Sequence, residues 1–225
     1  MVDRPIKLML SGRTASGMSS ASAYLADRYG ATCWSRSELM KRLAHALVDG
    51  VGETDDLLAR IIPEETRAEL REELLSFAAH YEPEDGFPVQ LYQDVVEICH
   101  AHDPLCFERE LEQRIKRAGR HDFTVIDDVK GGEDGAFAYF SERGYISVRV
   151  EAPEEARQRR LLARDGHLPR SDRLGHRVET GLDRAPHDFV IDNDTSPERF
   201  KARLDLLVET IRHGGYERGH GLPIS

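Results

Sequence analysis

The residues best suited to chemistry lie near the start of the chain, where two glycines and a serine follow a short apolar run. Gly12 and Gly17 enclose four residues, and Ser19 follows two positions later. A loop of this spacing holds phosphate oxygens with its backbone N–H groups, and its hydroxyl binds Mg²⁺. The spacing therefore predicts a nucleotide site with Ser19 as a metal ligand. We expect the cofactor to contact the whole loop: Gly12, Arg13, Thr14, Ala15, Ser16, Gly17, Met18, Ser19 and Ser20.

One residue of this loop departs from the pattern. Met18 stands where such a loop normally carries a lysine that reaches the β- and γ-phosphates. Arg13, the second residue of the loop, would return part of that charge as a catalytic residue, although a guanidinium is not a point-charge replacement for an ammonium. Lys41 or an arginine further along the chain is another source of the charge. The alternative interpretation is a Gly- and Ser-rich turn from strand to helix that holds no ligand.

Two carboxylates follow an apolar stretch in the middle of the chain, where Asp127 and Asp128 come directly after residues 123–126. Strand ends line the ligand crevice of a parallel sheet, and an acidic residue there can hold Mg²⁺ or act on the attacking oxygen. Only one of the two can face the site, because successive side chains of a strand alternate. We prefer Asp128 as the catalytic and metal-binding residue and assign Asp127 to the substrate. A pair of turn or N-cap aspartates is the alternative.

Arginines recur in the second half of a helix expected over residues 154–164. Arg157, Arg160 and Arg164 are spaced at i, i+3 and i+7 and share one helix face. Arginines stabilise the charge that spreads over a phosphoryl group during its transfer. The pattern predicts a basic lid over 157–175, with Arg157 and Arg160 as catalytic residues and Arg164 as a substrate-binding residue. A solvated basic helix balanced by nearby glutamates is the alternative.

Strand and helix patterns that could position these groups alternate along the chain. Apolar or β-branched runs predict strands at 6–10, 31–34, 123–126, 145–150 and 189–191. Apolar residues at helical spacing predict a helix that starts at the end of the loop and ends at Tyr29. The same spacing predicts further helices at 38–48, 64–80, 88–100, 105–118, 154–164 and 197–212. This alternation predicts an α/β fold in which helices flank a parallel sheet. We expect one domain over 1–213, a helical insertion on the substrate side at 50–104, and a flexible Gly-rich tail at 214–225.

Composition limits the functional classes that fit the chain. A net charge of −10 over 225 residues argues against a broad nucleic-acid surface, although it leaves room for a local basic site. The sequence has no apolar run of about 18 residues and no apolar leader, so we expect no membrane span. Cys33, Cys99 and Cys106 have neither disulfide nor metal spacing, and free thiols suit a reducing cytoplasm.

The order of these motifs resembles a known group of proteins. The loop is followed by Val-Ile-Asp-Asp-Val-Lys at 125–130 with Glu133 soon after, by the basic segment, by His-Arg-Val-Glu-Thr-Gly-Leu-Asp at 176–183, and by Asp-Phe-Val-Ile-Asp-Asn at 188–193. This series resembles the phage-type deoxynucleoside monophosphate kinases and the animal phosphomevalonate kinases over residues 6 to 212. The resemblance implies a P-loop kinase-like fold, ATP and Mg²⁺ as cofactors, and a small acceptor that already bears a phosphate. It places acceptor contacts on Lys130 and Glu179.

Three departures from the group bear on activity and specificity. Met18 replaces the lysine of the loop, Lys130 stands where the group has arginine, and Val178 stands where it has serine. A (deoxy)nucleoside monophosphate is the preferred acceptor. A phosphomevalonate-like metabolite and hydroxymethyl-uracil within DNA are alternatives, and a nucleotide-binding module with weak or no turnover is another. The sequence leaves open whether the chain is a monomer or a homodimer.

Overall fold

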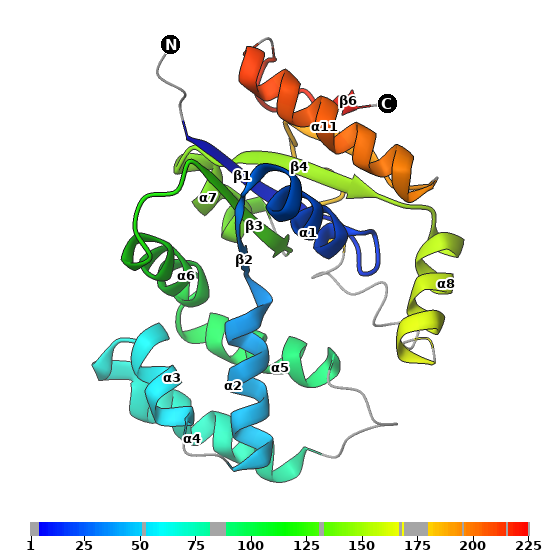
Figure 1. The fold of residues 1–225 in the computed structure, drawn as a ribbon. Coiled ribbons are helices and arrows are strands. Elements are labelled where there is room, and N and C mark those ends of the chain that lie inside the picture. Colours follow the sequence, from blue (N-terminus) through cyan, green and yellow to red (C-terminus); the bar gives the residue numbers. More distant parts are fainter. Residues whose placement is uncertain are drawn as a thin grey trace. The chain divides into compact units, whose positions relative to one another are not determined.

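The chain leaves one folded unit after the second strand and returns to it before the third. The computed structural model describes residues 5–50, 53–81, 89–130, 133–166, 168, 180–194, 196–214 and 216–224. One unit, here called the sheet unit, comprises residues 1–35 and 120–225, and the other, the helical unit, comprises 36–119. The sequence predicts an insertion at 50–104, whereas the unit that the structure separates begins earlier and ends later (Figure 1). The difference arises because the helices before residue 50 and after residue 104 pack into the same apolar core.

The sheet unit is built on a parallel sheet whose order is β2-β3-β1-β4-β5-β6 among the described residues. Every neighbouring pair runs parallel, with Leu8 opposite Val125 of one neighbour and Ile146 of the other. This confirms the predicted α/β fold. The strands are β1 (Ile6–Ser11), β2 (Thr32–Ser35), β3 (Phe123–Val129), β4 (Ile146–Glu151), β5 (Phe189–Asp192) and β6 (Leu222–Ile224).

The two faces of the sheet are covered differently. Leu8 and Leu10 pack in a core with residues of α1 (Met18–Tyr29) and α11 (Pro197–His213), which Figure 1 shows beside each other. Side chains of a strand alternate between faces, so Lys7, Met9 and Ser11 point to the opposite side. There Lys7 contacts the Arg143 carbonyl just after α7 (Ala138–Glu142), which a short π-helical turn, η1 (Glu133–Phe137), precedes. Another helix of the unit, α8 (Glu154–Asp165), follows β4.

The helical unit contains α2 (Ser37–Asp49), α3 (Thr54–Ile61), α4 (Glu64–His80), α5 (Val89–His102) and α6 (Cys106–Arg117). Its core includes many leucines together with Val95, Cys99, Cys106 and Phe107, all almost fully buried. One ion pair is enclosed in this unit: Arg36 Nε lies 2.6 Å from Glu108 Oε1, and the Glu108 side chain is fully buried. None of the described helices has both the length and the apolar character that crossing a membrane requires.

The end of the chain differs from the flexible tail predicted for 214–225. Residues 222–224 form β6, which pairs in parallel with β5, and Ile224 is buried in the core. Tyr216 packs on Phe189 with ring centroids 4.7 Å apart. The sequence did not predict this strand, because glycines are frequent in the segment and its few apolar residues, which complete the edge of the sheet, form no pattern of their own.

Candidate functional site

The predicted phosphate-binding loop joins the end of β1 to the start of α1, and its two glycines are required by close contacts. A Cβ atom at Gly12 would lie 2.5 Å from both Ser16 Oγ and the Val150 carbonyl oxygen. At Gly17, where φ is +117°, a Cβ atom would collide with the Asn193 side-chain amide. Ala15 also has a positive φ of 63°. The loop is therefore a tight cradle that only glycine permits at these two positions.

Two polar side chains hold this loop from outside. Arg160 Nη1 donates to the carbonyl oxygens of Ala15 and Ser16 at 3.1 Å, and its Nη2 donates to the Asn193 carbonyl at 2.7 Å. Asn193 Nδ2 donates to the Ser16 carbonyl at 2.7 Å. Burial, with a smaller effect of neighbouring Arg159, lowers the pKa of Arg160. The structure thus places Arg160 on the carbonyls of the loop, where it supports the cradle, rather than in the lid position expected from the sequence.

The side chain of Ser16 is buried within the loop. It is 1% exposed, and its Oγ has no hydrogen-bond partner among the described residues. A buried hydroxyl without a protein partner is costly, and a ligand atom, an ion or a water molecule can satisfy it. Ser16 also lines the cavity described below. An anion held by the loop would accept this hydrogen bond.

Met18 does not take the place of a phosphate-binding lysine. Its side chain is 7% exposed and belongs to the core that includes Leu8 and Phe200. A lysine reaches the loop from elsewhere, because Lys130 Nζ lies 2.8 Å from Thr14 Oγ1. The same amine lies 3.6 Å from Asp128 Oδ1. Lys130, predicted to bind the acceptor, is therefore in contact with the predicted phosphate-binding loop.

The two aspartates near the end of β3 diverge. Asp127 follows Val125 at the alternating position, which places it on the face covered by α1. Burial and then the charge of Asp127 raise the pKa of Cys33, a residue on that face, to about 11. Asp128 has a positive φ of 58° and turns toward Lys130. Asp127, rather than the preferred Asp128, thus shares a face of the sheet with the helix that carries Ser19.

A cavity of about 540 Å³ opens beside the loop at the carboxyl ends of β1, β4 and β5. The connection leaving β1 runs toward β2, whereas the connection leaving β4 runs toward β5 on the other side. Ligands of open α/β sheets bind at such a switch point. The lining includes the predicted residues Arg13 and Arg157 and several carboxylates. The complete set is Arg13, Ser16, Arg149, Val150, Glu151, Ala152, Pro153, Glu154, Arg157, Asp183, Asp192 and Asp194.

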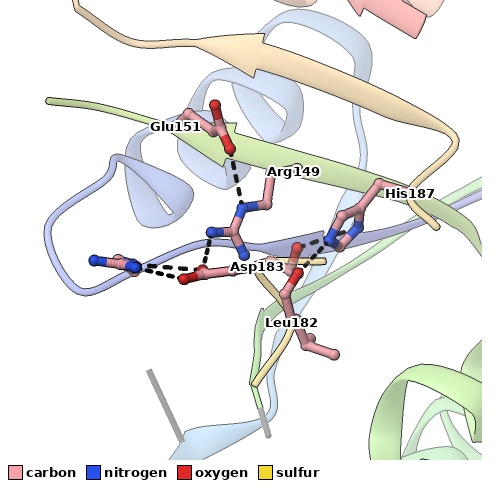
Figure 2. Close-up of polar contacts among 7 residues, drawn as sticks. Arg149, Glu151, Leu182, Asp183 and His187 are labelled. Carbon is pink, nitrogen blue, oxygen red and sulfur yellow. Dashed lines mark hydrogen bonds and ion pairs between the residues drawn. The ribbon is translucent and has the colours of Figure 1, made fainter. Parts of the chain in front are cut away.

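Asp183, which lines this cavity, joins two arginines, and Figure 2 shows its contact with Arg149. Its carboxylate accepts hydrogen bonds from both Arg13 and Arg149, and Arg149 Nε lies 3.4 Å from Glu151 Oε1. Burial alone would raise the pKa of Asp183, but the two arginines outweigh it and hold the pKa below its usual value. Sequence reasoning did not single out Asp183 or Arg149, although Asp183 closes the quoted motif at 176–183. Arg149 gave no signal, because it occupies an alternating position of an ordinary strand pattern.

His187 supports the segment that carries Asp183. Its Nε2 lies 3.0 Å from the Leu182 carbonyl oxygen, and its Nδ1 lies 3.5 Å from Ser11 Oγ at the end of β1. The ring packs edge-on against Phe137. These contacts are drawn in part in Figure 2 and fix the turn before Asp183 against the strand that leads into the loop.

The remaining predicted site residues are placed less tightly. Ser19 and Ser20 are exposed in the first turn of α1. Arg164 forms an exposed ion pair with Asp165 at 2.7 Å, away from the cavity lining. Glu179 and residues 169–175 of the predicted lid lie outside the described part of the chain. Within that part, no cluster of three His, Cys, Asp or Glu side chains could hold a metal ion by itself.

Comparison with known proteins adds evidence about the fold alone. No protein-family model matches the chain, and no curated protein sequence matches it. The crystal structure of TT1252 from Thermus thermophilus is similar with a TM-score of 0.51 and 19% identity, covering 92% of this chain and 98% of that one. Dephospho-CoA kinase from Campylobacter jejuni is also similar at 19% identity, covering 92% and 97% of the two chains, but its TM-score is 0.43. At that value the second similarity carries no argument about fold or activity.

Proposed function

We propose that the protein is an ATP-dependent phosphotransferase that acts on a small phosphorylated acceptor, preferably a (deoxy)nucleoside monophosphate. The observation that carries the proposal is the buried Ser16 hydroxyl, which has no partner among the described residues and lies within a glycine cradle at a helix N-terminus. Loops of this kind bind phosphate groups with backbone N–H groups and the positive end of the helix dipole. The acceptor class comes from the resemblance noted in the sequence.

The chemistry of the cavity suits a nucleotide. Arg13, Arg149 and Arg157 line it together with the carboxylates of Glu151, Glu154, Asp183, Asp192 and Asp194. Guanidinium groups recognise phosphate oxygens, whereas carboxylates accept hydrogen bonds only. A nucleotide offers both partners, since its phosphates accept and its hydroxyl and amino groups donate. A cavity for a simple anion would not need the carboxylates.

The chain's own residues would position and neutralise rather than form a covalent intermediate. The loop would hold the donor phosphates, with Arg160 and Asn193 keeping its carbonyls turned outward. Ser19 and Asp127 would hold Mg²⁺, which would supply positive charge to neutralise the phosphates. Arg157, at 6% exposure in the wall of the cavity, would stabilise charge on the transferred group.

A nucleotide-binding module without turnover is the second candidate. The burial of Met18 in the core favours this candidate. The position that normally carries the lysine for the terminal phosphates holds a side chain that packs in the core instead. This candidate predicts binding of Mg-ATP without phosphoryl transfer to any acceptor.

The test is transfer of the labelled γ-phosphate from Mg-ATP to a panel of acceptors. The panel contains ribo- and deoxynucleoside monophosphates, phosphomevalonate and hydroxymethyl-uracil DNA. Labelled product with one class of acceptor supports the kinase and names its substrate. Binding of Mg-ATP with no product supports the second candidate, and the absence of binding contradicts both.

Two matched variants test the assignment of the metal ligand. Asp127→Asn should lower transfer at least tenfold, in the range of a lost charged contact to the metal or substrate. Asp122→Asn is the control, because Asp122 is exposed and lies at the opposite end of the same strand. An Asp128→Asn loss larger than that of Asp127→Asn would return the metal to Asp128.

A further inference from the structure

The phosphate-binding loop contacts a lysine that its own sequence motif does not contain. Lys130 Nζ lies 2.8 Å from the hydroxyl of Thr14, the third residue of the loop. The Lys130 side chain is 13% exposed, so most of its stem is held by the protein. Position 18, where the motif normally supplies this ammonium, carries a methionine that is buried in the core. The loop therefore has an ammonium group beside it, delivered by β3 instead of α1.

The backbone at the end of β3 brings this lysine to the loop. β3 pairs directly with β1, and the register between the two shifts after Met9 so that Ser11 lies opposite Val129. Asp128 adopts a positive φ of 58° at this irregularity. The shift carries the chain to the edge of the loop, so that the residue after Val129 starts beside the first loop residues. Irregularities of this kind in a strand re-aim a side chain near functional sites.

The other cations around the loop are engaged in different ways. Arg13 and Arg149 both bind the carboxylate of Asp183. Arg160 donates to loop carbonyls, so its charge lies behind the cradle rather than inside it. Arg157 lines the cavity on the β4 side of the loop, whereas Lys130 comes from β3 on the other side of β1. Lys130 thus approaches the loop from the side of β3, the strand that also carries Asp127.

We propose that Lys130 replaces the missing loop lysine and binds the terminal phosphates of the donor nucleotide. This inference rests on the proposed nucleotide site but assigns Lys130 a different role from the acceptor contact implied by the resemblance. The Thr14 hydroxyl holds the ammonium against the loop before the ligand arrives. A charge that is positioned in advance and partly shielded from water stabilises phosphate charge more than a mobile surface lysine does.

The experiment measures binding of Mg-ATP, Mg-ADP and AMP to the full chain by calorimetry. Lys130→Met should weaken Mg-ATP binding about 10- to 100-fold, the range expected for loss of a charge-assisted contact, and leave AMP binding within about twofold. Lys130→Arg keeps a positive charge and should lose less. Lys7→Met is the control, because Lys7 lies at the opposite end of β1 and contacts the Arg143 carbonyl. Thermal unfolding of each variant verifies that it is folded.

A rescue variant separates the role in charge from a role in packing. Met18→Lys combined with Lys130→Met returns an ammonium at the usual position of the motif and should recover at least part of the lost affinity for Mg-ATP. Equal losses for Mg-ATP and AMP in Lys130→Met, or Mg-ATP binding within twofold of the parent, would overturn the inference. The parent's failure to bind Mg-ATP would overturn it together with the proposed function. Binding with the expected Lys130 pattern but without phosphoryl transfer would support the inference and overturn only the kinase activity.

Discussion

Removal of the Arg160 guanidinium should destabilise the sheet unit, because this side chain ties the phosphate-binding loop to the strand end at Asn193. Arg160→Met takes donors from three carbonyls, those of Ala15, Ser16 and Asn193. The Ser16 carbonyl keeps its hydrogen bond from Asn193 Nδ2, so the loss of the guanidinium falls mainly on the other two carbonyls, those of Ala15 and Asn193. Methionine retains most of the apolar stem, which confines the change to the charged end.

The magnitude follows from these contacts. A hydrogen bond to a charged group contributes about 1.5–3 kcal/mol. Arg160 is only partly buried, so water can replace some of each lost bond, and the lower value applies to each of the two carbonyls. The free energy of unfolding should therefore fall by about 3 kcal/mol. For a protein of this size that corresponds to a decrease of roughly 6–12 °C in Tm.

The assay can follow the sheet unit specifically. The chain contains a single tryptophan, Trp34, and it lies in β2. Its fluorescence during urea or thermal unfolding reports the sheet unit rather than the helical unit. Arg159→Met is the matched control, because Arg159 is the exposed neighbour of Arg160 on the same helix. An unfolding free energy for Arg160→Met within about 0.5 kcal/mol of this control would refute the reasoning.

Three further predictions concern other parts of the molecule. Arg36→Met leaves the buried Glu108 without its cation and should lower the free energy of unfolding by about 3–5 kcal/mol, measured by circular dichroism in urea; a loss below 1 kcal/mol would contradict the buried pair. Because arginines lower the pKa of Asp183, its contribution to stability is present above the ordinary carboxyl pKa of about 3.9 and is lost as the pH falls through the lower folded value. Asp183→Asn should therefore destabilise the protein at pH 6 more than at pH 3, and equal effects in urea titrations at both would show that the pairing is absent. With its pKa raised to about 11 by burial, Cys33 should react with a disulfide reagent at pH 8 roughly 100-fold more slowly than a free thiol, and labelling at the free-thiol rate would count against its burial.

The elements of this fold could be predicted because their signals are local. The apolar run before Gly12 and the leucines at helical spacing between residues 64 and 80 each depend on a few neighbouring residues, and the structure has a strand and a helix there. β6 was not predicted because the strand is only three residues long, contains Pro223 and follows a glycine-rich segment. A proline in a strand is tolerated at a sheet edge, and such a strand is recognisable only from its partner β5.

The candidate site was predicted only in part, for a related reason. The spacing of Gly12 and Gly17 is a local signal, and both glycines form the cradle that the spacing predicts. The positions of Lys130 and Arg160 depend on which strands become neighbours, since their contacts join residues more than a hundred positions apart. Strand order and register set those contacts, and neither is encoded in any one segment. The sequence therefore identifies which residues carry positive charge, but it does not show which atoms each of them contacts in the folded protein.

The strand order has a consequence for how the chain acquires its structure during synthesis. β1 is made first yet lies between β3 and β4, so it has no strand partner until residues 123–129 exist. Translation at about 5–20 residues per second makes this interval roughly 6–22 s for the 111 residues between Ser11 and Phe123. Meanwhile the uninterrupted segment 36–119 can pack its own apolar core. The cradle for phosphate, which needs Asn193 and Arg160, is thus assembled late, after the nascent helical unit has already emerged.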